Sequence, residues 1–247
     1  MPAQEQQLRV RSARSVRDET VVRRIKHLTR IKTCVILMGT VLLCVPGILH
    51  FQQQTAAANA MADRKKIAIT FDDGPHPFYT EQLLDGLKER GVVATFFVTG
   101  EHASLHPDII KRMSEEGHLV GNHTYSHMQL NKGNRETFKE ELIRTNEVIE
   151  ELTGQEVQYV RPPYGTWDKK FEQELNMFPV LWSIDPLDWC SDNVGGIVQR
   201  VTAKAEENSI ILMHDEYKST VTAALQIVDI LQEDGYEFVT VDEILFD

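Results

Sequence analysis

The chain has 247 residues, 42% of them hydrophobic, and a formal net charge of −11. This composition excludes a disordered chain, and the length allows one large domain or two small ones. Residues 1–32 hold 9 basic and 3 acidic side chains, which leaves 17 basic and 34 acidic ones in the remainder. A body this acidic argues against binding to nucleic acid.

The first predicted element is a membrane span. Residues 33–51 contain no Lys, Arg, Asp or Glu, and 19 helical residues span about 28 Å, close to the thickness of a bilayer core. Basic residues crowd the N-terminal side, so we expect 1–32 to be a cytoplasmic tail and the body to lie outside the cell membrane. An A-x-A pattern ending at Ala60 leaves an alternative, a signal peptide cleaved there to release a secreted protein. We favour an uncleaved single-pass anchor.

The remaining chain alternates strand and helix patterns after a Gln- and Ala-rich linker at 52–65. We expect seven strands, at 67–71, 92–98, 118–121, 157–160, 179–184, 209–213 and 238–241. We expect six helices, at 80–91, 107–117, 137–154, 168–177, 194–208 and 220–235. This alternation predicts an α/β fold with a parallel sheet. An open doubly wound sheet and a closed barrel both fit it.

Polar residues follow the C-terminal ends of five of these strands, at Asp72 and Asp73, His123, Arg161, Asp185 and Asp188, and His214. In parallel α/β folds active sites assemble at this edge of the sheet. The sequence Asp-Asp-Gly-Pro alone is ordinary turn chemistry. Five such strand ends together favour a catalytic site.

A metal site is indicated by His123 and His127, whose spacing lets both rings face one point. Imidazole and carboxylate suit zinc, and one of the two early aspartates would complete a three-ligand set. Three protein ligands leave positions open for water and substrate, as in catalytic zinc sites. The other aspartate can then serve as a base and His214 as an acid.

Five motifs occur in order: "TFDDGP", "HTYSH", "RPPYG", "DPLDW" and "ILMHD". Together they closely resemble the motifs of the polysaccharide deacetylases, the NodB-homology family or carbohydrate esterase family 4. The resemblance covers about residues 64–247. It implies a distorted (β/α)7 barrel and a catalytic domain at 66–247.

The resemblance also implies roles for individual residues. Asp72 would be the general base, held by Arg161, and His214 the general acid, tuned by Asp188. The metal, zinc or another divalent transition metal such as cobalt, would be held by Asp73, His123 and His127. Substrate contacts would come from the Tyr164 backbone amide, near the oxyanion, and from an acetyl pocket lined by Trp189 and Leu212.

The predicted function is therefore removal of N-acetyl groups from N-acetylglucosamine in an extracellular glycan, first of all peptidoglycan. Chitin oligomers and an exopolysaccharide are alternative substrates. An O-acetyl esterase acting on xylan-like polymers is a second class of enzyme that this chemistry allows. A catalytically inactive glycan-binding protein is a third possibility, against which the complete set of site residues argues.

Four further residues have no such partners in the sequence. We expect surface or loop positions for His102, His106 and His118. Cys190, which follows Trp189, is the one cysteine outside 33–51. It therefore has no partner for a disulfide within the body, and we expect a shielded thiol with a packing role.

Overall fold

The computed structural model describes residues 64–245, and Arg64–Asp247 forms one compact unit. The predicted tail at 1–32, the anchor at 33–51, the cleavage point at Ala60 and nearly all of the linker lie outside the described residues. Among residues 64–245, no helix combines the length and the apolar character needed to cross a bilayer.

The described region is built on parallel strands. Seven of them form one sheet in the order β5-β4-β3-β2-β1-β6, with β7 paired to the start of β1. Their bounds are β1 (Lys65–Asp73), β2 (Thr95–Val98), β3 (Leu119–Asn122), β4 (Tyr159–Val160), β5 (Phe178–Pro179), β6 (Ser209–His214) and β7 (Tyr236–Phe238).

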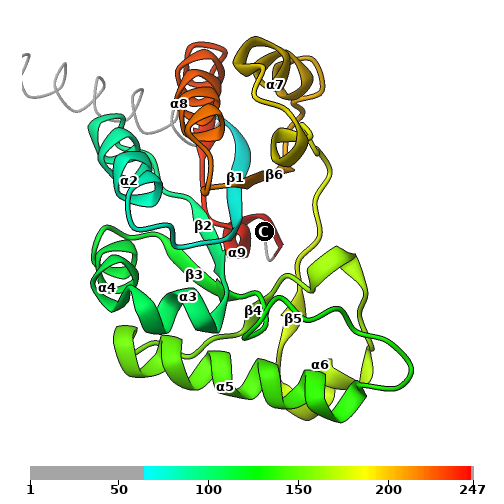
Figure 1. The fold of residues 1–247 in the computed structure, drawn as a ribbon. Coiled ribbons are helices and arrows are strands. Elements are labelled where there is room, and N and C mark those ends of the chain that lie inside the picture. The colour runs from blue at the N-terminus through cyan, green and yellow to red at the C-terminus, as the bar shows by residue number, and fades with distance from the viewer. Residues whose placement is uncertain (1–63, 246–247) are drawn as a thin grey trace, which may run out of the picture. The chain divides into compact units, whose positions relative to one another are not determined.

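Helices pack around these strands (Figure 1). They are α2 (Tyr79–Glu89), α3 (Gly100–Leu105), α4 (Pro107–Glu115), α5 (Arg135–Thr153), α6 (Lys170–Leu175), α7 (Val194–Thr202), α8 (Lys218–Glu233) and α9 (Val241–Leu245), with short 3-10 turns η1 (Pro163–Gly165) and η2 (Asp188–Cys190). The helix α5 ends at Gly154, which takes the left-handed conformation with φ 70°, as expected for a helix C-terminus.

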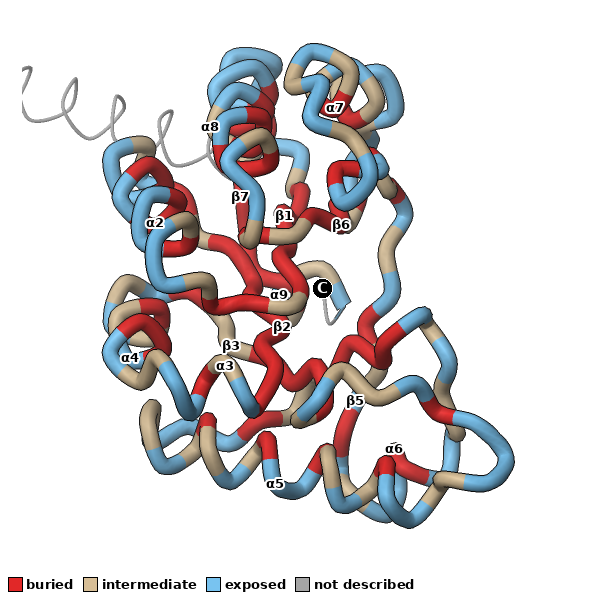
Figure 2. Tube along the Cα trace, in the orientation of Figure 1, coloured by how far each residue is buried: buried red, intermediate tan, exposed pale blue. Residues whose placement is uncertain are grey.

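β1, with 9 residues, is buried on both faces. Ile67 to Phe71 are all buried. Ile67, Ile69 and Phe71 belong to the main hydrophobic cluster, whereas Ala68 packs in a second cluster with Phe97 and Val241. Figure 2 shows this buried stretch in red, with exposed residues on the outer sides of the helices. Burial of this kind fixes the register of β1 against its neighbours.

That register aligns the ends of the strands. Asp72 lies opposite His214 of β6, and Asp73 lies opposite Val98 of β2. Across the next pairs, Val98 lies opposite Asn122 of β3, and Asn122 opposite Val160 of β4. The residues that follow β3 and β4, His123 and Arg161, therefore lie at the same edge of the sheet as the two aspartates.

The sheet curves into an α/β half-barrel that is loosely joined on one side. Between β5 and β6 the connection is a single parallel bridge from Ile184 to Ile211, with the amide of Leu212 donating to the Ile184 carbonyl at 2.9 Å. In Figure 1 the yellow segment on this side runs without a helix between β5 and η2.

The predictions for two strands were misplaced. The strand expected at 179–184 is a short one at Phe178–Pro179. In this register the next backbone donor to the Val180 carbonyl would be residue 162, a proline that has no N–H, and the Arg161 side chain donates to that carbonyl instead, at 3.1 Å. The strand expected at 238–241 ends at Phe238, because α9 begins at Val241. The sequence Thr-Val-Asp-Glu at 240–243, which begins one residue before α9, is typical of a helix start.

Candidate active site

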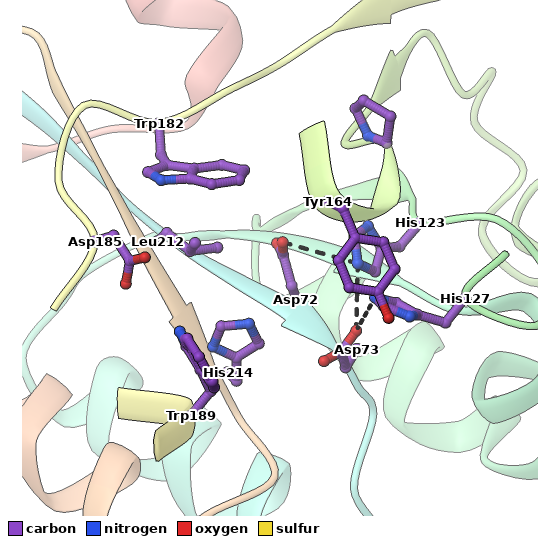
Figure 3. Close-up of a pocket in the computed structure, with 11 residues that line it drawn as sticks. Asp72, Asp73, His123, His127, Tyr164, Trp182, Asp185, Trp189, Leu212 and His214 are labelled. Atoms are coloured by element: carbon purple, nitrogen blue, oxygen red, sulfur yellow. Dashed lines mark ion pairs between the residues drawn. The ribbon is translucent and has the colours of Figure 1, made fainter. Parts of the chain in front are cut away.

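A cavity of about 350 Å³ opens at the C-terminal edge of the sheet. Figure 3 shows its lining, with Asp72 in the centre, His123 and His127 on one side, and His214 with the two tryptophans on the other. Eight of the ten predicted site residues line it: Asp72, Asp73, His123, His127, Tyr164, Trp189, Leu212 and His214. The other two, Arg161 and Asp188, lie behind this lining and contact Asp72 and His214.

Three side chains converge to form a possible metal site. Asp73 Oδ1 lies 3.2 Å from His123 Nε2 and 3.3 Å from His127 Nε2. The three candidate ligand atoms all lie within 4.8 Å of one another. One oxygen and two imidazole nitrogens are a donor set suited to zinc and related divalent metals.

The hydrogen bonds around these three side chains favour a bound metal ion between them over direct hydrogen bonds from one side chain to another. His123 Nδ1 lies 2.6 Å from the Arg161 carbonyl oxygen, which can only accept, so Nδ1 carries the proton. When Nε2 carries no proton, its lone pair points toward Asp73 Oδ1, a buried oxygen that has no hydrogen-bond partner among the described residues. Two acceptors facing each other need a positive charge between them, and a bound metal supplies it.

Electrostatics keep these ligands in the forms that bind metal. Burial opposes ionisation of Asp73, but its interactions with His123 and then His127 outweigh that effect and lower its pKa to about 2. Burial also lowers the pKa of His127. Metal binding requires an ionised carboxylate and neutral imidazoles.

The backbone at Asp73 is held by a residue of α3, His102, and by the residue that precedes α3, Thr99. Asp73 has φ 75°, a left-handed conformation that is uncommon outside glycine. Its carbonyl oxygen lies 2.8 Å from His102 Nδ1 and accepts a 3.2 Å hydrogen bond from Thr99 Oγ1. The expectation of a surface or loop position for His102 was therefore incomplete, because its ring supports a candidate metal ligand.

Asp72 lies deeper than Asp73 and is paired with a cation. Its Oδ1 accepts a 2.8 Å hydrogen bond from Arg161 Nη1, and both side chains are almost entirely buried. Arg161 also donates to Thr70 Oγ1 at 2.6 Å and to the Val180 carbonyl at 3.1 Å. Asp72 Oδ2 is turned toward His123, 3.9 Å from Nε2.

His214 is paired with a buried carboxylate on the opposite side of the cavity. Asp188 Oδ1 lies 3.1 Å from His214 Nδ1, while Oδ2 accepts from the His214 amide and from Thr220 Oγ1, both at 2.8 Å. Burial opposes protonation of His214, but Asp188, with smaller contributions from Asp72 and Asp73, raises its pKa to about 9.

The walls of the cavity are largely aromatic. Tyr164 has φ 58°, and its ring makes an edge contact with His127, with the ring centres 5.1 Å apart. Trp189 is exposed and Leu212 is buried, and both line the cavity. Trp182 was not among the predicted site residues, although it lines the cavity together with Asp185. Its position three residues before the strand-end Asp185 was the available signal.

The expectation for Cys190 was wrong, and that for His118 was incomplete, because His118 lies in the loop before β3 but is not at the surface. Cys190 is exposed rather than shielded. His118 is buried, its Nδ1 accepts from the Ala94 amide at 3.0 Å, and burial lowers its pKa to about 4. An apolar neighbourhood built from distant segments hides this histidine, which local sequence cannot reveal.

Comparison with known proteins shows to which family the chain belongs. The family model described as polysaccharide deacetylase matches residues 59–180. A chitooligosaccharide deacetylase of Rhizobium leguminosarum bv. trifolii is 44% identical over 160 residues, which are 63% of this chain and 74% of the relative. The chain belongs to the polysaccharide deacetylase family.

Other similar proteins carry peptidoglycan in their names. The peptidoglycan-N-acetylglucosamine deacetylase PgdA of Listeria monocytogenes is 39% identical over 180 residues, or 73% of this chain. The chain spans 39% of the length of that relative. The structure of the peptidoglycan deacetylase PdaC from Bacillus subtilis matches with a TM-score of 0.71 and 39% identity, covering 74% of this chain and 91% of that one. These matches confirm the resemblance drawn from the five motifs.

Proposed function

We propose that this protein is a zinc-dependent N-deacetylase that acts on N-acetylglucosamine residues of peptidoglycan outside the cell. One arrangement carries the proposal. A three-ligand metal site lies in the same cavity as a buried carboxylate held by an arginine and a histidine held by a carboxylate. Such a set offers a cation, a base and an acid around one point, which amide hydrolysis requires.

Asp72 is the proposed base. Its Oδ1 is occupied by Arg161, whereas Oδ2 faces the candidate metal ligands. A water molecule that attacks the acetamide carbonyl carbon gives up one proton, which Asp72 accepts. Arg161 keeps Asp72 ionised for this step because an opposite charge at hydrogen-bond distance favours the charged form of a carboxylate.

His214 is the proposed acid. When the carbon–nitrogen bond breaks, the departing nitrogen takes a proton from His214, and acetate and a glucosamine unit result. Asp188 supports this role because it holds the imidazole by Nδ1 and leaves Nε2 for the substrate. With its pKa raised to about 9, His214 carries the required proton at neutral pH.

The remaining site residues bind the acetyl group. The Tyr164 backbone amide is the proposed donor to the oxyanion. Trp189 and Leu212 line the cavity and form the proposed pocket for the acetyl methyl group. When bound at Asp73, His123 and His127, zinc, or cobalt in its place, supplies Lewis-acid polarisation of the carbonyl and of the attacking water.

The extracellular position of the reaction rests on the sequence alone. The basic segment 1–32 followed by the uncharged segment 33–51 supports a membrane anchor with the catalytic domain, 66–247, outside. Cleavage after Ala60 would give a secreted enzyme instead. We also infer that the half-barrel, joined at Ile184 and Ile211, is the distorted (β/α)7 barrel expected for the family.

A second substrate deserves a direct comparison, because the Rhizobium leguminosarum relative is named a chitooligosaccharide deacetylase. The test measures acetate release by the full-length protein from purified peptidoglycan, from N-acetylglucosamine oligomers and from acetylated xylan, each with and without added zinc. We expect zinc-dependent release, fastest from peptidoglycan. Faster release from the oligomers would assign the alternative substrate, and release from xylan alone would make the protein an O-acetyl esterase. No release from any substrate would favour the glycan-binding alternative.

A further inference from the structure

The loop that carries both candidate metal-binding histidines has a strained backbone. Thr124 has φ 64° and His127 has φ 55°, and neither is glycine. Left-handed conformations in such residues persist when surrounding contacts hold them. The contacts that hold this loop therefore help to determine where the His127 ring points.

Part of the loop is held by α3. The amides of Gly100 and Glu101, at the start of that helix, donate to the carbonyl oxygens of Thr124 and Tyr125, both at 3.0 Å. These bonds hold the first half of the loop, next to His123. They do not reach Ser126, which immediately precedes His127.

The second half of the loop is held by two side chains. Thr124 Oγ1 accepts from the Met128 amide, just after His127, at 3.0 Å, and Glu141 of α5 binds Ser126, just before His127. Glu141 Oε2 accepts from the Ser126 amide at 2.6 Å, and the Ser126 hydroxyl lies 3.1 Å and 3.0 Å from Oε1 and Oε2. Both carboxylate oxygens thus bind the residue adjacent to His127. Ser126 is exposed, so its packing contributes little and its position depends on these hydrogen bonds.

A neighbouring contact from the same helix supports this arrangement. The guanidinium carbon of Arg144 lies 3.4 Å from the centre of the Tyr125 ring. Arg144 and Glu141 are three residues apart on α5, so they lie on the same side of the helix. α5 therefore contacts two consecutive loop residues, Tyr125 and Ser126, with two charged side chains.

We propose that Glu141 is a positioning residue for the metal: by binding the amide and hydroxyl of Ser126, it fixes the direction of the His127 ring toward Asp73. This rests on the proposed metal site. Glu141 does not touch the metal ligands or the substrate cavity, so its effect passes through the backbone. Groups that orient metal ligands in this way typically change metal affinity by about 10- to 100-fold.

The test compares matched variants of the full-length protein. Glu141→Ala removes the contact, Glu141→Gln keeps an acceptor oxygen, and Glu140→Ala removes the same charge from an exposed position on the same helix. Zinc affinity is measured by competition with a chromophoric chelator. Amide hydrogen exchange of residues 123–128 is measured in the metal-free protein.

We expect Glu141→Ala to weaken zinc binding by about 10- to 100-fold and to speed exchange at 123–128. Glu141→Gln should recover much of the affinity, and Glu140→Ala should bind zinc as the unchanged protein does. Equal zinc affinity in Glu141→Ala and the unchanged protein would overturn the proposal. So would an equal loss in Glu140→Ala, which would indicate a general charge effect.

A milder variant guards against misfolding. Ser126→Ala removes the hydroxyl and keeps the amide. We expect it to lower zinc affinity less than Glu141→Ala does. Combined with Glu141→Gln, it should remove only the contact of the hydroxyl in addition. If the variants bind zinc with this pattern but the unchanged protein releases no acetate, the positioning role of Glu141 stands and the proposed deacetylase activity is refuted. A protein that binds no zinc at all would refute both.

Discussion

Arg161 and Asp72 form a buried ion pair at the base of the cavity. The guanidinium is completely buried, and its Nη1 donates to Asp72 Oδ1 at 2.8 Å. The ring of Phe97 lies under the guanidinium, with its centre 4.3 Å from the guanidinium carbon. Because both charged groups are almost entirely buried, each depends on the other, and the pair links the stability of the sheet to the proposed base.

Removing one partner of this pair should destabilise the protein. Arg161→Met leaves Asp72 buried without its cation, and we expect a loss of about 3–5 kcal/mol in the free energy of unfolding. Denaturant unfolding measures it. The control is the double variant Arg161→Met/Asp72→Leu, which should be more stable than Arg161→Met alone. Additive losses in the double variant would contradict the interpretation of a dependent pair.

The pairing of His214 with Asp188 predicts a shift in the pH dependence of activity. Because the pKa of His214 is raised from 6.5 to about 9, the protonated acid is lost, and kcat/KM should fall, as the pH rises through about 9. Asp188→Asn removes the main cause of the increase and should move this alkaline limb toward 6.5. Asp185→Asn is the control, because Asp185 lines the cavity but does not contact His214.

The same pair affects stability in a defined pH range. A raised pKa in the folded protein contributes stability that is fully present below about pH 6.5 and is lost as the pH rises through about 9. Asp188→Asn should therefore lose more stability at pH 6 than at pH 10. Equal losses at the two pH values, measured by denaturant unfolding, would contradict the pairing.

Zinc should stabilise the folded protein through the three ligands. At a zinc concentration of about 100 times Kd, binding adds about 2.7 kcal/mol, which corresponds to an increase in Tm of about 5–10 °C. His127→Ala should lose most of this increase, whereas His106→Ala, which changes a histidine outside the cavity, should keep it. An equal zinc effect on both variants would place the metal elsewhere.

Trp182 should contribute to substrate binding. Its ring lines the cavity and lies 5.8 Å from the guanidinium carbon of Arg161. Aromatic contacts of this kind contribute about 0.5–1.5 kcal/mol, so Trp182→Ala should lower kcat/KM by roughly twofold to tenfold, mainly through KM. Leu181→Ala changes the exposed neighbour and should have no comparable effect.

Sequence patterns predicted the site residues that directly follow the parallel strands. Asp72, His123, Arg161 and His214 all follow apolar runs, and the edge of a parallel sheet brings such residues together whatever the details of the connections. The family resemblance then separated the role of Asp72 from that of Asp73. The structure adds that Asp72 is buried with Arg161 whereas Asp73 faces the two histidines.

The supporting contacts were not predictable from the sequence. His102 contacts a backbone carbonyl and Glu141 contacts a backbone amide and hydroxyl, and neither kind of contact leaves a pattern in the side-chain order. The short β5 strand, by contrast, had a signal in the sequence, because Pro162 lacks the N–H that would continue the ladder to the Val180 carbonyl.

The division of roles between adjacent aspartates is the central claim, and Asp72→Asn tests it most directly. Zinc content and acetate release from peptidoglycan are measured together for this variant, with His127→Ala for comparison. We expect Asp72→Asn to retain zinc and to lose activity by about 10²- to 10⁴-fold, the usual contribution of a general base, whereas His127→Ala should lose zinc itself. Near-normal acetate release by zinc-loaded Asp72→Asn would contradict the assignment of Asp72 as the base.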